Sequence, residues 1–152
     1  MITDIQLGKR SLDVIAQHQA EVLGAEEGEP LFFLTSAGAV VVHDFYNTIE
    51  KTFCQIAEEI DGGLPQGDAW YQRLLQRMTV AIPAYRPAVI DQTLAGRLGE
   101  YLRFRHLFRH IYGFELDWAR IRPLLVDLPA VLAEFIRQID DFVRYLQSIQ
   151  HD

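Results

Sequence analysis

The residues best suited to chemistry in this sequence are two histidines and six arginines between positions 97 and 122. A histidine titrates near neutral pH, so one imidazole can both take and give a proton. An arginine presents a planar fork of donors that matches a phosphate group. The arginines of this stretch therefore suit bidentate contacts to a phosphate. The two histidines and six arginines are Arg97, Arg103, Arg105, His106, Arg109, His110, Arg120 and Arg122.

Charge is unevenly distributed along the chain. It has 14 Lys and Arg against 21 Asp and Glu, a net charge of −7. The stretch 97–122 holds six arginines and three acidic residues, a net +3, which leaves −10 for the remainder. Bulk coating of nucleic acid or of an anionic membrane is therefore disfavoured. We expect an acidic body with one basic site; the alternative is that these arginines are solvated or pair with acids.

The order of residues inside this stretch adds a motif. Arg105, His110 and Tyr112 form an R-x4-H-x-Y pattern near the end of a helical stretch. Together with its neighbours and with residues 43–57, the pattern resembles the HEPN superfamily and, more closely, the HepT-like ribonucleases. The resemblance covers about residues 39–125.

The resemblance implies a metal-independent endoribonuclease that acts as a homodimer, with two copies of the motif in one cleft. Arg105 would hold the scissile phosphate, and His110 would be the general acid or base for attack by the ribose 2′-OH. Tyr112 matches the tyrosine that a partner nucleotidyltransferase antitoxin modifies with AMP (AMPylation). Supporting RNA contacts would come from three neighbours: Arg103, His106 and Arg109.

The choice of motif arginine stays open. The residue after it is commonly Asn in the family and is His106 here, while Arg103 forms an R-x6-H spacing with His110 that the superfamily allows. In a helix, His110 lies about 140° from Arg105 but nearly in line with Arg103. Arg105 falls on an apolar stripe, where it is costly unless it is paired or faces a ligand or partner. Its cooperation with His110 therefore needs a helix distortion or a second subunit.

Hydrophobic periodicity predicts the elements that position these residues. Apolar residues recur at three- and four-residue spacings, which is typical of an all-α, up-down bundle of about five helices, HEPN-like, in one domain over 1–152. Asp68 and Asp117 are expected caps and Pro87 a first-turn residue. Pro123 and Pro129 predict a break or kink. The expected helices span about 3–23, 31–60, 68–82, 87–112 and 117–149.

Several of these helices carry apolar residues on more than one side. A core of only five helices is expected to leave part of that surface exposed, so we expect a homodimer. The alternative is a monomer whose core buries all of it.

The lone cysteine, Cys54, excludes an intrachain disulfide and a zinc site built from several cysteines. We expect it to be buried and inert in a reducing compartment, which favours a cytoplasmic protein. No signal peptide follows Met1, and the longest dense apolar stretch, 31–42, is too short to span a bilayer. We therefore expect no membrane partner.

Other chemistry is weakly indicated. His106 and His110 have a spacing compatible with metal binding, but no nearby Asp or Glu completes a site, so we expect no metal. No P-loop, glycine-rich nucleotide motif or Ser-His-Asp order is present, so we expect no cofactor. The remaining candidates are expected in the core or at a partner interface: His43, Asp44, Trp70 and Trp118.

Three functions remain open from the sequence. The motif and the local positive charge favour a HepT-like toxin ribonuclease, which is our expectation. His106 in place of Asn and the acidic body favour a non-catalytic HEPN-fold dimer that binds a nucleotidyltransferase, a nucleotide or RNA. The third is a structural α-helical dimer whose arginines pair with local acids.

Overall fold

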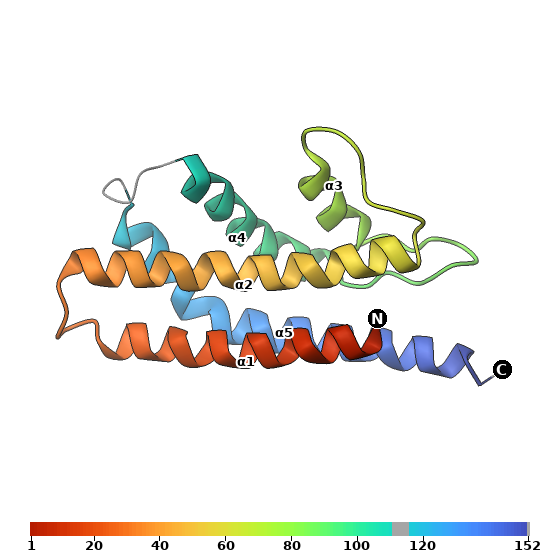
Figure 1. Cartoon of the computed structure of the whole chain (residues 1–152), viewed down its shortest axis with the longest axis horizontal. Coiled ribbons are helices and arrows are strands. Elements are labelled where there is room, and N and C mark those ends of the chain that lie inside the picture. Colours follow the sequence, from red (N-terminus) through yellow and green to blue (C-terminus); the bar gives the residue numbers. More distant parts are fainter. Residues whose placement is uncertain (111–115, 152) are drawn as a thin grey trace.

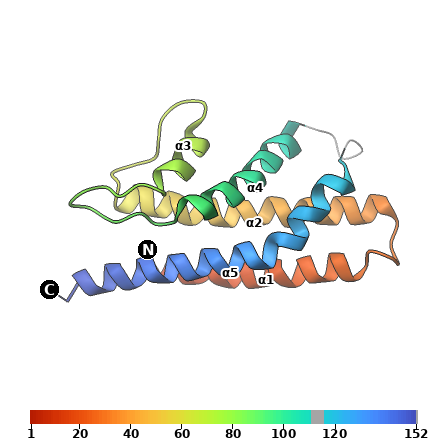
Figure 2. The same ribbon diagram turned by 180° about the vertical axis from the view of Figure 1, so that it is seen from behind.

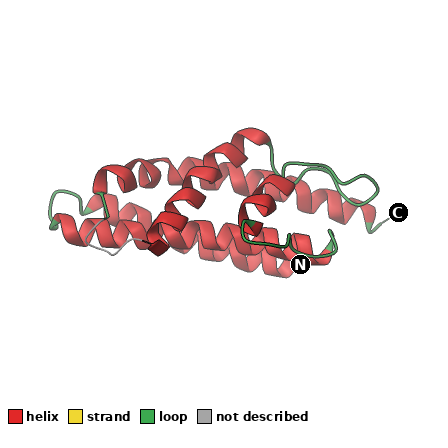
Figure 3. Cartoon of the chain, turned by 90° about the horizontal axis from the view of Figure 1, so that it is seen from above, coloured by secondary structure: helices red, strands yellow, loops and turns green. Residues whose placement is uncertain are grey.

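The computed structural model describes residues 1–110 and 116–151, without the side chains of residues 109 and 110. Five helices occur in this part of the chain, as predicted, and it contains no strand beyond an isolated bridge (Figures 1 and 3). Helices α1, α2, α4 and α5 alternate in direction, and the short α3 lies beside α4. The helices are α1 (Ile2–Gly24), α2 (Leu31–Glu59), α3 (Trp70–Arg77), α4 (Gln92–His110) and α5 (Trp118–Ile149).

Helix α2 lies at the centre of the bundle and contacts each of the other four helices. Its apolar residues recur every three or four positions, so one broad face is buried along its length. Gly62 takes a φ of 86°, which lets the Gly63 amide bond the Ala57 carbonyl at 2.9 Å beyond the end of the helix. The predicted stop at this glycine pair is confirmed.

Helices α2 and α5 approach closely at Gly38. A Cβ atom there would lie 2.9 Å from side-chain carbons of both Ile121 and Leu125, and 3.1 Å from the Trp118 ring. A larger residue would push the helices apart. Trp118 thus packs against the core, as predicted.

The two prolines of α5 bend the helix without interrupting it, which confirms the kink option (Figure 2). Pro129 has no amide hydrogen to donate to the Leu125 carbonyl. The buried Gln19 amide donates to that carbonyl at 2.7 Å. The Tyr101 hydroxyl donates to the adjacent Leu124 carbonyl at 2.7 Å, so α1 and α4 both bind α5 at its bend.

Helix α3 is shorter than predicted. Its N-cap is Ala69 rather than Asp68, and it ends at Arg77 instead of continuing to Ile82. The Met78 carbonyl accepts bonds from the Val89 and Ile90 amides, which come from the far end of the following loop. This long-range contact ends the helix before Pro83 can.

The loop between α3 and α4 is anchored by a buried ion pair. Arg86 Nε lies 2.6 Å from Asp61 Oδ1, and both side chains are almost fully buried. The same guanidinium donates to the carbonyls of Arg77, Val80 and Pro87. Pro87 therefore belongs to this loop, and the expectation that it opens a helix is wrong.

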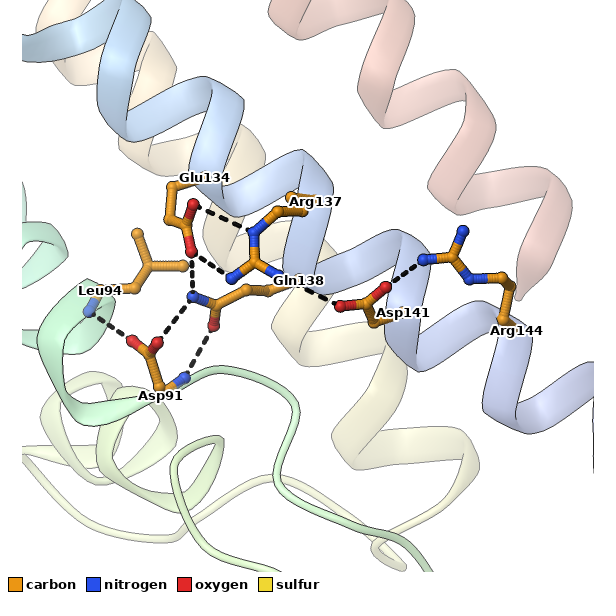
Figure 4. A network of polar contacts seen from close by, with 7 residues as sticks. All are labelled: Asp91, Leu94, Glu134, Arg137, Gln138, Asp141 and Arg144. Carbon is orange, nitrogen blue, oxygen red and sulfur yellow. Dashed lines mark hydrogen bonds and ion pairs between the residues drawn. The ribbon is translucent and has the colours of Figure 1, made fainter.

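Helix α4 begins instead at Gln92, and the carboxylate of the preceding Asp91 caps it by accepting a bond from the Leu94 amide at 2.8 Å. Gln138 of α5 accepts from the Asp91 amide and donates to its carboxylate, and it also donates to Glu134 (Figure 4). This network fixes the start of α4 against α5. The predicted cap of α5 is confirmed, because Asp117 accepts from the Ala119 amide at 3.0 Å.

No helix among the described residues is both long and apolar enough to cross a bilayer.

Candidate functional site

Helix α4 carries three of the predicted site residues, Arg103, Arg105 and His106, on two different faces. One face is buried and contains Leu94, Leu98, Tyr101 and, one turn later, Arg105, which is only 2% exposed. The other face carries Arg103 and His106, both exposed. The two candidate arginines are therefore separated by the geometry of a single helix.

Arg105 is held on the buried face by α2. Its NH2 group donates to Glu50 Oε2 at 2.7 Å, and NH1 donates to Asn47 Oδ1 at 3.1 Å. The guanidinium carbon lies 4.9 Å from the ring centre of Tyr46 and 5.9 Å from that of Tyr71. The requirement that an arginine on the apolar stripe be paired is met inside one chain.

The polar contacts continue along α2. Asn47 Nδ2 lies 3.1 Å from Nδ1 of the half-buried His43, whose ring packs 5.0 Å from that of Phe108 on α4. His43 is thus a polar residue at the α2–α4 contact, whereas Asp44 is exposed. From His43 to Glu50, about two turns, this stretch of α2 faces α4.

Burial and the nearby Glu50 carboxylate raise the pKa of two neighbouring side chains, those of Cys54 and Tyr46. Burial, with Glu50 as a second cause, raises the pKa of the Cys54 thiol to about 11. Burial also raises the pKa of the Tyr46 phenol above its usual range. Both groups are protonated at neutral pH, so half-buried Cys54 is a poor nucleophile there, in line with the predicted inert role.

On the other face of α4, Arg103 and His106 line a groove against α3. Arg103 forms an ion pair with Glu100, and both side chains are largely exposed. Tyr71 Oη lies 3.4 Å from His106 Nδ1, and the two rings are stacked with 6.2 Å between centres. The groove has a volume of 650 Å³. Its walls include Tyr71, Leu75, Gly99, Leu102, Arg103 and His106.

The remaining motif residues fall outside the described part. The α4 backbone is described through His110, but the side chains of Arg109 and His110 are not, and Tyr112 lies in the undescribed stretch 111–115. Position 110 follows position 106 by one helical turn. The groove face of α4 therefore leads toward the motif histidine.

A known protein family matches most of the chain. A family model described as "HepT-like protein" matches residues 37–146. The chain belongs to this family. The match runs from α2 into the last turns of α5, so this HepT-like protein of the HEPN superfamily has the all-α fold that the resemblance implies. Searches of curated proteins and of solved structures returned no match.

The basic stretch of the HepT-like protein is partly neutralised. Arg105 pairs with Glu50 and Arg122 with Glu26, both acids from outside the stretch, and Arg103 pairs with Glu100 inside it. The alternative in which the arginines pair with acids therefore holds for these three. Arg120 is exposed at the start of α5.

Three residues of this site were not identified from the sequence. Asn47 and Glu50 are one turn apart within the stretch of α2 that resembles the family, so their spacing was a usable signal. Tyr71 had none, because only the packing of α3 places it beside His106. Trp70 is half-buried against the core, as expected.

Metal ligands do not gather in the described residues. No group of three or more His, Cys, Asp or Glu side chains with suitable geometry occurs among them. The spacing of His106 and His110 is not tested by this observation, since the His110 side chain lies outside it.

Proposed function

We propose that this HepT-like protein is a metal-independent endoribonuclease of the toxin type that cleaves RNA with His110. The observation that carries the proposal is the family match over residues 37–146, which includes the arginine and histidine of the motif. A groove beside the helix that bears them supports it. The protein acts in the cytoplasm, a compartment consistent with its single unpaired thiol.

In this proposal His110 takes the proton from the ribose 2′-OH, whose oxygen attacks the adjacent phosphorus. The bond from phosphorus to the 5′-oxygen then breaks, and the leaving oxygen receives a proton. An imidazole with an ordinary pKa can do both near pH 7. An arginine bound to the non-bridging phosphate oxygens stabilises the charge that grows on them.

The family resemblance assigns that arginine role to Arg105. That residue is only 2% exposed and its guanidinium donates to Glu50 and Asn47 of α2, so it must become accessible to the phosphate to fill that role. Arg103 needs to leave only a surface pair with Glu100, which is worth little. We therefore keep both arginines in the proposed site, with Arg105 as the family-based choice and Arg103, His106 and Arg109 as RNA contacts.

The proposed active form is a homodimer in which two motifs share one cleft. Large exposed apolar side chains support a partner surface, since bundles ordinarily bury such groups. They include Leu31, Phe32, Phe33 and Val40 of α2. Sedimentation of the purified protein tests this: a dimer is expected, and a monomer that still cleaves RNA would contradict the shared cleft.

The proposed regulator is a nucleotidyltransferase antitoxin that transfers AMP to Tyr112. A bulky anion near the cleft would repel RNA by charge and block it by shape. Intact-mass measurement after co-expression with the product of the neighbouring gene is expected to show an adenylyl adduct that Tyr112→Phe removes. An unmodified chain would contradict this regulation.

A second candidate is a non-catalytic dimer that binds a nucleotidyltransferase, a nucleotide or RNA. The observation that favours it is the internal pairing of Arg105, whose guanidinium is buried and hydrogen-bonded to Asn47 and Glu50. Incubation of single-stranded RNA with the protein in a chelator separates the two functions. Cleavage that His110→Ala abolishes supports the ribonuclease, whereas intact RNA in a tight complex supports the binder.

A further inference from the structure

The groove between α3 and α4 has the size and shape of a small-ligand site. Its volume of 650 Å³ lies in the range of about 300–1,000 Å³ that is usual for such sites. Gly99 contributes to its wall without a side chain, and a Cβ built there would meet no atom within 4 Å. The space is therefore open over the middle of α4.

The chemistry of the groove suits a planar base. Leu75 and Leu102 provide apolar surface, and Tyr71 provides an aromatic ring. Proteins that bind single-stranded nucleic acid stack bases on such rings. The Tyr71 ring is also held in position before a ligand binds. Its hydroxyl lies 3.4 Å from His106 Nδ1, and its ring centre lies 5.9 Å from the guanidinium carbon of Arg105.

The charge at the groove suits a phosphate. The side chain of Arg103 is 70% exposed, and its partner Glu100 is 58% exposed, so water screens that ion pair. A phosphodiester can replace Glu100 without uncovering a buried charge. The groove therefore offers an aromatic ring suited to a base and an exposed arginine suited to a phosphate.

We propose that the α3–α4 groove binds one nucleotide of single-stranded RNA, with Tyr71 stacking on its base and Arg103 contacting its phosphate. This inference rests on the proposed function for its placement, because position 110 lies one helical turn beyond His106. The nucleotide would neighbour the scissile phosphate. Tyr71 and Gly99 then determine how the substrate is held there.

Two glycines of α4 offer a matched test. Gly96 and Gly99 both lie inside the helix, and neither has an atom within 4 Å of a built Cβ, but Gly99 lines the groove and Gly96 does not. In a His110→Ala background, which leaves the RNA intact, Gly99→Leu should weaken binding of a short single-stranded RNA containing 2-aminopurine by about ten-fold or more. Gly96→Leu should keep the affinity of the background.

Tyr71 provides a second, independent variant. Tyr71→Ala should weaken binding of the same RNA about ten-fold and should no longer quench the fluorescence of 2-aminopurine. Tyr71→Phe keeps the ring, so it should keep both the affinity and the quenching. Circular dichroism checks that each variant is folded; if Tyr71→Ala unfolds, the glycine pair decides. Free AMP that competes with the RNA, and loses this ability in Gly99→Leu, would show that the groove also takes nucleotides from solution.

The proposal is overturned if both groove variants bind RNA as tightly as their background. It is also overturned if Gly99→Leu separates a dimer while its RNA affinity is unchanged, because the groove would then cover a second copy of the chain. Failure of the ribonuclease proposal is distinguishable. Wild-type protein would leave RNA intact, while the groove variants would still lose binding.

Discussion

Each of the two faces of α4 carries an arginine, but the two arginines differ in burial and in pairing. On the buried face, Arg105 is 2% exposed and has hydrogen bonds to both Asn47 and Glu50. On the groove face, Arg103 is largely exposed and has one surface partner. A buried ion pair matters to stability mainly because removal of one partner leaves the other charge buried and uncompensated. An exposed charge is available to a ligand.

This difference suggests a division of labour. Arg105 joins α2 to α4 and holds the helix that carries the motif, whatever it does later with phosphate. Arg103 can change partner without disturbing that joint. Stability should therefore respond to changes on the buried face, and RNA handling to changes on the groove face.

The largest effect on stability is expected for Arg105→Ala. It leaves Glu50, whose side chain is 13% exposed, without its cationic partner, which should cost about 3–5 kcal/mol of unfolding free energy. Urea denaturation measures it. The double variant Arg105→Met with Glu50→Leu should recover most of the loss, because no unpaired buried charge remains. An Arg105→Ala protein as stable as wild type would show that the two faces do not differ.

Arg103→Ala should have the reverse profile. Its unfolding free energy should stay within about 0.5 kcal/mol of wild type, while RNA cleavage should fall about ten-fold through loss of one phosphate contact. Arg144→Ala is a matched control, since Arg144 is also 70% exposed and paired with an acid one turn away on another helix. Equal cleavage by both variants would remove Arg103 from the site.

A smaller effect is expected at the anchored start of α4. Hydrogen bonds from Arg137 and then Gln138 lower the pKa of Glu134 from its ordinary 4.5 to about 2. A lowered pKa in the folded state contributes stability above pH 4.5 that is lost as the pH falls toward 2. Glu134→Gln should therefore flatten the dependence of stability on pH in that window, as acid titrations followed by circular dichroism would show. An unchanged slope would contradict an ionised Glu134 in this network.

Much of the fold was predictable because its signals are local. The periodic apolar residues of α1, α2 and α5, the glycine pair after α2 and the Asp117 cap all act within a few residues of one another. The boundaries of α3 and the start of α4 were wrong because distant contacts set them. The Arg86–Asp61 pair and the bonds from Val89 to Met78 cannot be read from nearby residues.

The site was predictable to the same extent. The helix period indicated that Arg105 must be paired if it lies on the apolar stripe, and it separated Arg105 from Arg103. It did not identify Glu50, which is 55 residues away, because that contact depends on how α2 packs against α4. Tyr71 was missed for the same reason.

Cleavage of single-stranded RNA by purified protein in the presence of a chelator, compared between wild type and His110→Ala, tests the proposed ribonuclease most directly. Wild type should cut, and the variant should be slower by about 100-fold or more, as expected when a general acid or base is removed. Folding of the variant is checked by thermal melting. RNA left intact by wild type, or cut equally well by a folded His110→Ala protein, would contradict the assignment of catalysis to this histidine.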